Sequence, residues 1–302
     1  MPQPPRADAP DLAPPPGLTV AAAARWAAGL LAERGVPESR LDAELLLARL
    51  LGWDRAALHA HPDRPLGESE AREYAHWVAR RRAREPLPYI TGVAAFYGLE
   101  LAVTPDVLIP RPETELLVEL ALGHLRRAGL ARPLVADVGT GSGAIAIALA
   151  RALPGARVLA VDLSAAALRV AAANARRHGV GARIGFWQGD LLAACAGPLD
   201  LLLANLPYIR PDERPGLEPE VGVHEPWLAL DGGPDGLALV RRLLRQAATR
   251  LAPGGLALFE IGAAQGPAAL AAAREACPAA AVSLRQDYAG LDRVVEIHAG
   301  GA

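Results

Sequence analysis

The sequence predicts an α/β protein in which a Rossmann-like, doubly wound sheet is preceded by a small helical bundle and a β-hairpin connector. Three observations support this prediction. Apolar residues recur with helical spacing from Thr19 to about Glu85. Apolar and polar residues then alternate from Pro86 to Pro112. Beyond Pro112, short apolar strands alternate with helical segments. A chain of 302 residues also exceeds the usual size of one domain, so two domains are expected.

Composition limits the chemistry that the chain can perform. All 31 basic residues other than histidine are arginine, which excludes a lysine Schiff base and a Walker-type phosphate loop. The formal net charge of −2 argues against a protein that coats nucleic acid. Only Cys195 and Cys277 are present, so neither a disulfide framework nor a cysteine-rich metal site is expected, and a cytoplasmic location fits. No apolar stretch is long enough to predict a membrane span.

The N-terminal segment, residues 1–17, is predicted to be a disordered, proline-rich tail. Seven of the first sixteen residues are proline, and the segment lacks the apolar run of a signal peptide. We therefore expect no contribution from it to the fold.

Residues 18–85 are predicted to form a helical domain. A first helix begins after a Thr19 N-cap and ends at Gly35. A second helix begins at Ser39, where Asp42 three residues later indicates a capping box. A third helix spans residues 68–85, and its predicted inner face consists of Tyr74, Trp77 and Val78.

The third helix ends in a cluster of arginines: Arg80, Arg81, Arg82 and Arg84. Cations at a helix C-terminus complement the helix dipole, which favours an ordinary solvated helix end. A site for the phosphates or the acidic patch of a partner remains the alternative.

Residues 86–112 are predicted to form a β-hairpin connector, because two interior glycines, Gly92 and Gly98, interrupt the alternating pattern. Residues 113–302 are then predicted to form the α/β domain. Its expected strands are Pro133–Val138, Arg157–Asp162, Ala182–Trp187, Leu199–Ala204, Leu256–Ile261, Ala281–Gln286 and Arg293–His298.

The first of these strands leads into a glycine-rich turn in the sequence "VADVGTGSGAIAIALA". Gly139, Gly141 and Gly143 allow the backbone to turn sharply and approach a ligand, and the following helix directs its amide donors to the same place. About twenty residues later, Asp162 ends the next strand, where it can accept both hydroxyls of a ribose. This combination predicts a nucleoside site. Because "GTGSGA" also satisfies the dinucleotide fingerprint, a nicotinamide-dependent dehydrogenase stays open at this point.

The fourth strand ends in Asn205-Leu206-Pro207-Tyr208, within "LDLLLANLPYI". This stretch resembles the catalytic motif of methyltransferases that use S-adenosylmethionine and act on planar, amide-like nitrogens. The lone pair of such a nitrogen is delocalised, so a site must hold its hydrogens with two acceptors and leave the nitrogen facing the methyl donor. Asn205 and a nearby backbone carbonyl offer the acceptors, Tyr208 offers a stacking face, and Pro207 stiffens the turn.

The motif "NLPY" is also similar to that of ribosomal RNA adenine methyltransferases. Other segments separate the two possibilities: "LIPRPETE", "YITG", "FYGLEL", "EPWLALDGGPDGL", "FEIG" and "DYAGLDRVV" closely resemble the glutamine methyltransferases that modify peptide-chain release factors, the HemK/PrmC family. An adenine dimethyltransferase would carry its helical domain after the sheet, whereas here the helical pattern comes first. The resemblance implies a class I methyltransferase fold.

The resemblance also implies S-adenosylmethionine as the cofactor. Asp162 would bind the ribose hydroxyls, and Asp190 would lie near the adenine edge. The implied cofactor-binding residues are Gly139, Thr140, Gly141, Ser142, Gly143, Asp162, Asp190, Leu191 and Asn205. No metal is implied. In "IPRPETE", Arg111, Glu113 and Thr114 would either order the surroundings of the cofactor or form structural salt bridges, and Glu225 and Pro226 would shape a lid.

The implied reaction is methylation of the glutamine of the Gly-Gly-Gln loop in class 1 release factors. Asn205, Pro207 and Tyr208 would be catalytic, and the substrate-binding residues would be Asn205, Leu206, Pro207 and Tyr208. The helical domain at residues 18–85 would dock the release factor. We expect a monomer that binds neither membrane nor nucleic acid directly.

Two positions depart from the family's usual pattern. Leu206 stands where the motif commonly has proline, and we expect this position to contribute mainly backbone geometry. Leu191 follows Asp190 where many members have an aromatic residue, while Phe186 and Trp187 lie slightly earlier.

Overall fold

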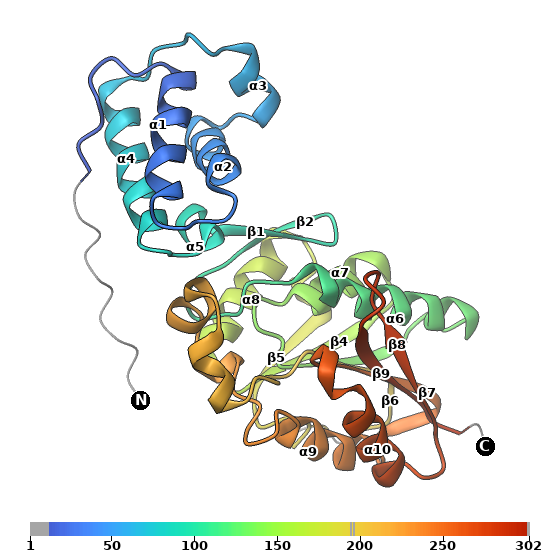
Figure 1. Cartoon of the computed structure of the whole chain (residues 1–302). Helices are drawn as coiled ribbons and strands as arrows, with labels where there is room; N and C mark the ends of the chain where they lie inside the picture. The colour runs from blue at the N-terminus through green and yellow to red at the C-terminus, as the bar shows by residue number, and fades with distance from the viewer. Residues whose placement is uncertain (1–11, 194, 196, 301–302) are drawn as a thin grey trace. The chain divides into compact units, whose positions relative to one another are not determined.

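The computed structural model describes residues 12–193, 195 and 197–300. Most of the tail predicted at residues 1–17 lies outside these described residues. The chain divides into two units (Figure 1). One contains residues 1–92 together with 218–224, and the other contains residues 93–217 and 225–302.

The helical unit is built from five helices over the described residues: α1 (Val20–Ala32), α2 (Ser39–Leu51), α3 (Arg55–Ala60), α4 (Glu68–Arg82) and α5 (Leu87–Thr91). Thr19 is the N-cap of α1, as predicted, and its hydroxyl accepts a hydrogen bond from the Ala22 amide at 3.3 Å. The predicted inner face of α4 is confirmed, because Tyr74 and Val78 are fully buried and Trp77 packs against the same core.

The capping box predicted at Ser39 and Asp42 is wrong. Ser39 is already the first helical residue of α2, and Glu38 occupies the N-cap without a side-chain bond. The Asp42 carboxylate instead accepts a hydrogen bond from Arg81 Nε at 2.7 Å. A buried guanidinium competes successfully for this carboxylate, since a charge-assisted bond is stronger than a bond to a backbone amide.

The arginine cluster at the end of α4 also differs from the expectation of a solvated helix end. Arg81 is buried, and both Arg81 and Arg84 donate to Glu220 Oε1 at 2.7 Å. Burial raises the pKa of Glu220, but the hydrogen bonds from Arg84 and Arg81 outweigh it and hold that pKa at about 2. These contacts make residues 218–224 part of the helical unit, although the chain on both sides belongs to the other unit.

The second unit begins with a hairpin and continues as a seven-stranded sheet. The hairpin pairs β1 (Val93–Phe96) with β2 (Leu99–Ala102). The sheet has the order β5-β4-β3-β6-β7-β9-β8, in which β9 runs antiparallel to β7 and β8. Its strands are β3 (Leu134–Val138), β4 (Arg157–Asp162), β5 (Ile184–Gln188), β6 (Leu199–Ala204), β7 (Leu251–Glu260), β8 (Ala281–Gln286) and β9 (Asp292–His298). All seven predicted strands are present, with shifted ends at several of them.

Helices cover both faces of this sheet, as the prediction of a doubly wound fold requires (Figure 1). One face is covered by α6 (Glu115–Arg127), α7 (Ala144–Ala152) and α8 (Ala165–Arg177), and the other by α9 (Ala238–Ala247) and α10 (Gly266–Ala276). Alternate residues along a strand contribute to opposite cores: Val135 packs with the first group of helices and Ala136 with the second.

Asn174 joins three elements of this unit. Its Nδ2 donates to the carbonyls of Ala102 and Ser142, both at 2.9 Å, and its Oδ1 accepts from the Ala102 amide at 2.8 Å. Asn174 is almost completely buried. Helix α8 is thereby tied to strand β2 and to the glycine-rich turn that contains Ser142.

Replacing Asn174 by alanine should lower the free energy of unfolding by roughly 2–5 kcal/mol, because the buried groups that it satisfies would lose their partners. Chemical denaturation followed by circular dichroism measures this change. Arg177→Ala on the same helix removes only an exposed ion pair with Glu100 and should cost less than about 1 kcal/mol. Equal effects of the two substitutions would contradict the bridging role of Asn174.

Candidate active site

The candidate site lies at the carboxyl ends of β3, β4 and β6. From β3 the chain proceeds outward through β4 to β5, and then returns to the other side of β3 as β6. The strand order therefore reverses between β3 and β6, and a crevice at such a reversal is where open α/β sheets bind ligands. The glycine-rich turn follows β3, Asp162 ends β4, and Asn205 follows β6, so the structure brings these three predicted features to one edge.

The glycine-rich turn uses its glycines for different purposes. Gly139, Gly141 and Gly143 all have positive φ, at 75°, 55° and 83°. A Cβ on Gly143 would lie 3.0 Å from Ile147 Cδ1, and one on Gly139 would lie 3.0 Å from Leu206 Cδ2. A Cβ on Gly141 would meet nothing nearer than a carbonyl oxygen at 4.0 Å. Gly143 and Gly139 permit packing, whereas Gly141 borders open space that a ligand can fill.

Asp137 supports the turn from beneath. Its Oδ2 accepts hydrogen bonds from the Thr140 hydroxyl at 2.6 Å and from the Ala146 amide at 3.1 Å, which caps the first turn of α7. Burial raises the pKa of Asp137 to about 6, against the lowering effect of these bonds. Its Oδ1 is buried without a partner among the described residues.

Asp162 is placed as the sequence predicted, at the end of β4 and facing the turn. Its two carboxylate oxygens accept one backbone hydrogen bond each, from Gly141 and from Ser164, both at 2.9 Å. Burial raises its pKa. Because a carboxylate has about four acceptor positions, Asp162 keeps acceptor capacity for the hydroxyls of a ribose. Together with the open space at Gly141, this arrangement fits the ribose of S-adenosylmethionine.

The segment after β5 contains Asp190 and Leu191. It lies beside the end of β4, because the Gly189 amide donates a hydrogen bond to the Asp162 carbonyl at 3.0 Å. Asp190 Oδ2 forms an ion pair with Arg242 at 2.5 Å, and half of its side chain is exposed. Leu191 has φ 53°, which is unusual for a residue other than glycine, and its side chain is buried. The Leu191 side chain packs into the apolar core on one face of the sheet.

Asn205 follows the last residue of β6. Its Nδ2 donates to Thr114 Oγ1 at 2.9 Å, and no described residue donates a hydrogen bond to its Oδ1. The next residue, Leu206, is buried in the core, and its side chain lies against Gly139. Leu206 therefore contributes side-chain packing as well as the backbone geometry expected from the sequence, and it couples the Asn205 segment to the glycine-rich turn.

Tyr208 is held by its backbone. Its carbonyl accepts a hydrogen bond from Gln265 Nε2 at 2.9 Å, while Gln265 Oε1 accepts one from the Gly262 amide at 2.9 Å. A Cβ on Gly232 would lie 2.6 Å from Tyr208 Cα, and a Cβ on Gly236 would clash with the Tyr208 carbonyl. Burial, with the charge of Glu260 as the next cause, raises the Tyr208 pKa to about 12, so the phenol is neutral at physiological pH.

The segment before α6 contributes Thr114 and a buried ion pair. Arg111 Nη2 lies 2.5 Å from Glu225 Oε1, and the Glu225 side chain is almost inaccessible. Burial raises the pKa of Glu225, which the positive charge of Arg111 opposes. Of the two roles left open for Arg111, the structure shows the salt-bridged one. The cofactor-ordering role of Glu113 and the lid role of Pro226 remain predictions.

Glu260 is the last residue of β7, the strand next to β6, and the sequence analysis did not identify it as a site residue. It is buried, neither carboxylate oxygen has a hydrogen-bond partner among the described residues, and burial raises its pKa to about 7. A usable signal was present: "LALFEIG" places one acid at the end of an otherwise apolar strand, and a buried acid without a cation partner is typical of functional sites.

The described residues contain no group of three or more histidine, cysteine, aspartate or glutamate side chains that could hold a metal ion. They also contain no helix of the length and apolar character needed to cross a membrane.

Comparison with known proteins identifies relatives over most of the chain. Residues 22–92 match the family model of the PrmC N-terminal domain, and residues 135–220 match that of a methyltransferase domain. The release factor glutamine methyltransferase of Moorella thermoacetica is 47% identical over 264 residues, which cover 87% of this chain and 92% of the relative. That of Geobacter sulfurreducens is 43% identical over 273 residues, covering 89% and 93% of the two chains.

A solved structure, the release factor-specific protein-(glutamine-N5) methyltransferase from Alicyclobacillus acidocaldarius, is 32% identical to this chain. The match covers 66% of this chain and 99% of the other, with a TM-score of 0.41.

Replacing Asp162 by asparagine should weaken the binding of S-adenosylmethionine by ~1.5–3 kcal/mol, about ten- to a hundredfold, because a charge-assisted acceptor becomes a neutral amide of nearly the same shape. Isothermal titration calorimetry measures the affinity. Asp200→Asn, at a carboxylate that accepts from the Leu134 amide at the opposite end of the sheet, is the matched control. Undiminished binding by the Asp162 variant would contradict its assignment to the ribose.

Proposed function

The chain belongs to the family of release factor glutamine methyltransferases, and we propose that it methylates the side-chain amide nitrogen of the glutamine in the Gly-Gly-Gln loop of class 1 peptide-chain release factors. One observation supports this assignment most directly. Asn205 projects an amide whose Nδ2 is held by Thr114 at 2.9 Å and whose Oδ1 is left without a donor among the described residues. An acceptor in this state suits a substrate that brings N–H donors.

S-adenosylmethionine supplies an electrophilic methyl group, and the chain's own residues must compensate for the poor nucleophile. We assign Asn205 Oδ1 to one N–H of the glutamine amide and a backbone carbonyl of the same motif to the other. The Tyr208 ring stacks on the planar amide, and Pro207 restricts the turn between them. With S-adenosylmethionine bound, transfer would form the N–C bond, break the methyl–sulfur bond to leave a neutral thioether, and release one N–H proton to solvent. Positioning can supply up to ~7–11 kcal/mol in favourable intramolecular reactions, so a strong base is not required.

The cofactor is assigned to the turn after β3 and to the ends of β4 and β5. Gly141 provides room for it and Asp162 takes its ribose hydroxyls. The backbones of Thr140, Ser142 and Leu191 lie along the same edge, and Asp190 is assigned to the adenine side. Because Leu206 lies against Gly139, the substrate residues and the cofactor turn are coupled directly.

We assign a protein substrate in preference to ribosomal RNA. The helical domain precedes the sheet, which is the order of the release factor enzymes, and residues 22–92 match the PrmC N-terminal domain. We further propose that the protein acts as a monomer in the cytoplasm, where release factors work, without a direct contact to nucleic acid.

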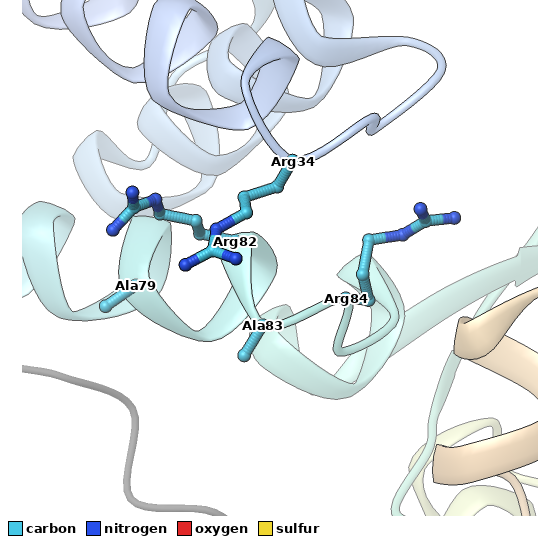
Figure 2. A pocket seen from close by; sticks show the side chains of 5 residues that line it. All are labelled: Arg34, Ala79, Arg82, Ala83 and Arg84. Carbon is cyan, nitrogen blue, oxygen red and sulfur yellow. The ribbon is translucent and has the colours of Figure 1, made fainter.

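The helical unit is proposed to dock the release factor. Its arginines are not equally available for this purpose, since Arg81 and Arg84 are bound to Glu220. Arg34 and Arg82 line a surface hollow at the end of α4, together with Arg84 and two alanines (Figure 2). Within the described part of the chain, Arg82 has one long ion pair, 3.7 Å from Glu33. This hollow suits an acidic side chain of the partner.

Asn205→Ala should slow methyl transfer by ten- to a hundredfold or more, because the reacting amide loses an acceptor worth about 1–3 kcal/mol. Cofactor affinity should change far less. Single-turnover transfer of labelled methyl groups to a release factor at saturating S-adenosylmethionine measures the rate. Tyr208→Phe should be milder than Tyr208→Ala, because the ring face carries the stacking.

Two substrate controls accompany this measurement. A release factor with alanine in place of the loop glutamine should accept no label, and neither should ribosomal RNA. Label in the RNA, or a parental rate for Asn205→Ala, would refute the proposed function.

Reversing the charges of Arg34 and Arg82 to glutamate should raise the KM for the intact release factor by about tenfold, with kcat and cofactor affinity unchanged. Arg72→Glu, on the same helix but away from the hollow, is the matched control. Steady-state kinetics at low ionic strength provides the measurement. If the double variant and the control shared the parental KM, the docking site would lie elsewhere.

A further inference from the structure

We propose that Thr114 and Glu260 are positioning residues for this methyl transfer: the Glu260 carboxyl takes the hydroxyl hydrogen of Thr114, and the Thr114 oxygen takes Asn205 Nδ2, which leaves Asn205 Oδ1 facing the substrate amide. The role in catalysis rests on the proposed function. The orientation of the Asn205 side chain is testable without it.

The need for such a device follows from the symmetry of an amide side chain. The two ends of Asn205 have nearly the same size, but one donates hydrogen bonds and the other accepts them. A flipped Asn205 would present N–H groups to the N–H groups of the glutamine. The 2.9 Å bond from Nδ2 to Thr114 Oγ1 selects the productive orientation, provided that the threonine oxygen acts as an acceptor.

Thr114 can act as an acceptor only if its own hydrogen has another destination. Its side chain is buried, so water does not readily serve. A hydroxyl without a second acceptor could instead donate to Asn205 Oδ1, which would reverse the amide. The direction of the Thr114–Asn205 bond is therefore decided by the group on the other side of Thr114.

Glu260 is the group in the right place. Strand β7 pairs with β6 in a register that aligns Phe259 with Ala204, so Glu260 and Asn205 are the next residues along the two strands. Burial raises the pKa of Glu260, and the nearby Thr114 hydroxyl opposes this rise more than any other group does. Neither Glu260 oxygen has a hydrogen-bond partner among the described residues, so the bond from the Thr114 hydroxyl to Glu260 belongs to the proposal. Hydrogen bonds of an active site that are long in the free enzyme often tighten when substrate binds.

The charged neighbours of Glu260 have other partners. Arg111, from the same segment as Thr114, is paired with Glu225 at 2.5 Å, and Arg293 on β9 is paired with Asp287 at 3.0 Å. Glu113 and the neutral phenol of Tyr208 also lie near Glu260. No cation therefore competes with the Thr114 hydroxyl for the carboxyl oxygens among the described residues.

The composition of the chain makes the orientation directly measurable. The protein has only two asparagines, Asn174 and Asn205, so selective ¹⁵N-asparagine labelling gives two pairs of side-chain amide signals in an NMR spectrum. Asn205→Ala assigns them. Asn174, which is bonded at both ends, serves as the internal reference.

Thr114→Val should shift the Asn205 side-chain signals and speed their hydrogen exchange about tenfold, because Nδ2 loses its acceptor. Glu260→Gln should move the same signals, since the glutamine amide can donate to Thr114 and compete with Asn205. Thr114→Ser keeps the hydroxyl, so its Asn205 signals should match those of the parent protein. Glu260→Gln added to Thr114→Val should have no further effect on Asn205, because the connecting hydroxyl is absent.

The kinetic arm uses the same variants in single-turnover methylation. Thr114→Val and Glu260→Gln should each lower the rate about five- to fiftyfold, with the dissociation constant of S-adenosylmethionine unchanged, and the double variant should be no slower than Thr114→Val alone. Thr114→Ser should recover most of the rate. Glu296→Gln, at an equally buried glutamate on β9 that is paired with Arg285, controls for the loss of a buried carboxylate, and thermal unfolding of each variant reports on the fold.

The outcomes separate the two proposals. A parent protein that transfers no methyl group to release factors would refute the proposed function, while the NMR signals would still decide the orientation. Unchanged Asn205 signals in Thr114→Val, or parental rates in both Thr114→Val and Glu260→Gln, would overturn the positioning role. An effect of Glu260→Gln on Asn205 that persists in Thr114→Val would also overturn it, because the influence would then bypass the threonine.

Discussion

The close approach of the backbone after β6 to glycines on two sides is the constraint on which the rest of the site depends. Leu206 packs against Gly139, and Tyr208 is enclosed by Gly232 and Gly236. Any larger side chain at these glycines would push the Asn205 segment away from the cofactor turn or out of its own loop. The site is therefore positioned mainly by backbone packing, and the polar contacts from Thr114 and Gln265 refine that position.

Five acidic residues of the second unit, all at least partly buried, differ in the direction of their pKa shifts. Glu296, buried on β9, has a lowered pKa because hydrogen bonds from Arg285 and His298 outweigh the effect of its burial. Asp137, Asp162, Glu225 and Glu260 all have raised pKa values, with burial as the largest cause. These four belong to the candidate site or support it. Burying a carboxyl group without enough hydrogen-bond or cation partners destabilises a fold. Several such carboxyl groups at one edge of the sheet therefore indicate a binding site, whereas a structural ion pair satisfies its own charge.

The architecture could be predicted from the sequence, and so could those parts of the site that have a local sequence pattern. The strand alternation predicted the sheet, and the spacing from Gly139 to Asp162 predicted a nucleoside edge, because each pattern lies within one continuous segment. The capping box at Ser39 failed since Arg81, 39 residues away, takes the Asp42 carboxylate. Thr114 was placed near the site by resemblance, but its bond to Asn205 spans 91 residues, and no local spacing rule can predict such a pairing.

The two asparagines show how satisfaction of hydrogen bonds distinguishes structure from function. Both are at least partly buried and both lie beside the glycine-rich turn, Asn174 through Ser142 and Asn205 through the neighbouring Leu206. Asn174 uses its donor and acceptor ends within the protein, so it can only hold elements together. Asn205 uses only its donor end among the described residues. A protein that leaves an oriented acceptor without a donor retains binding capacity for something outside its own fold, and a planar amide with two N–H groups is the ligand that this acceptor fits.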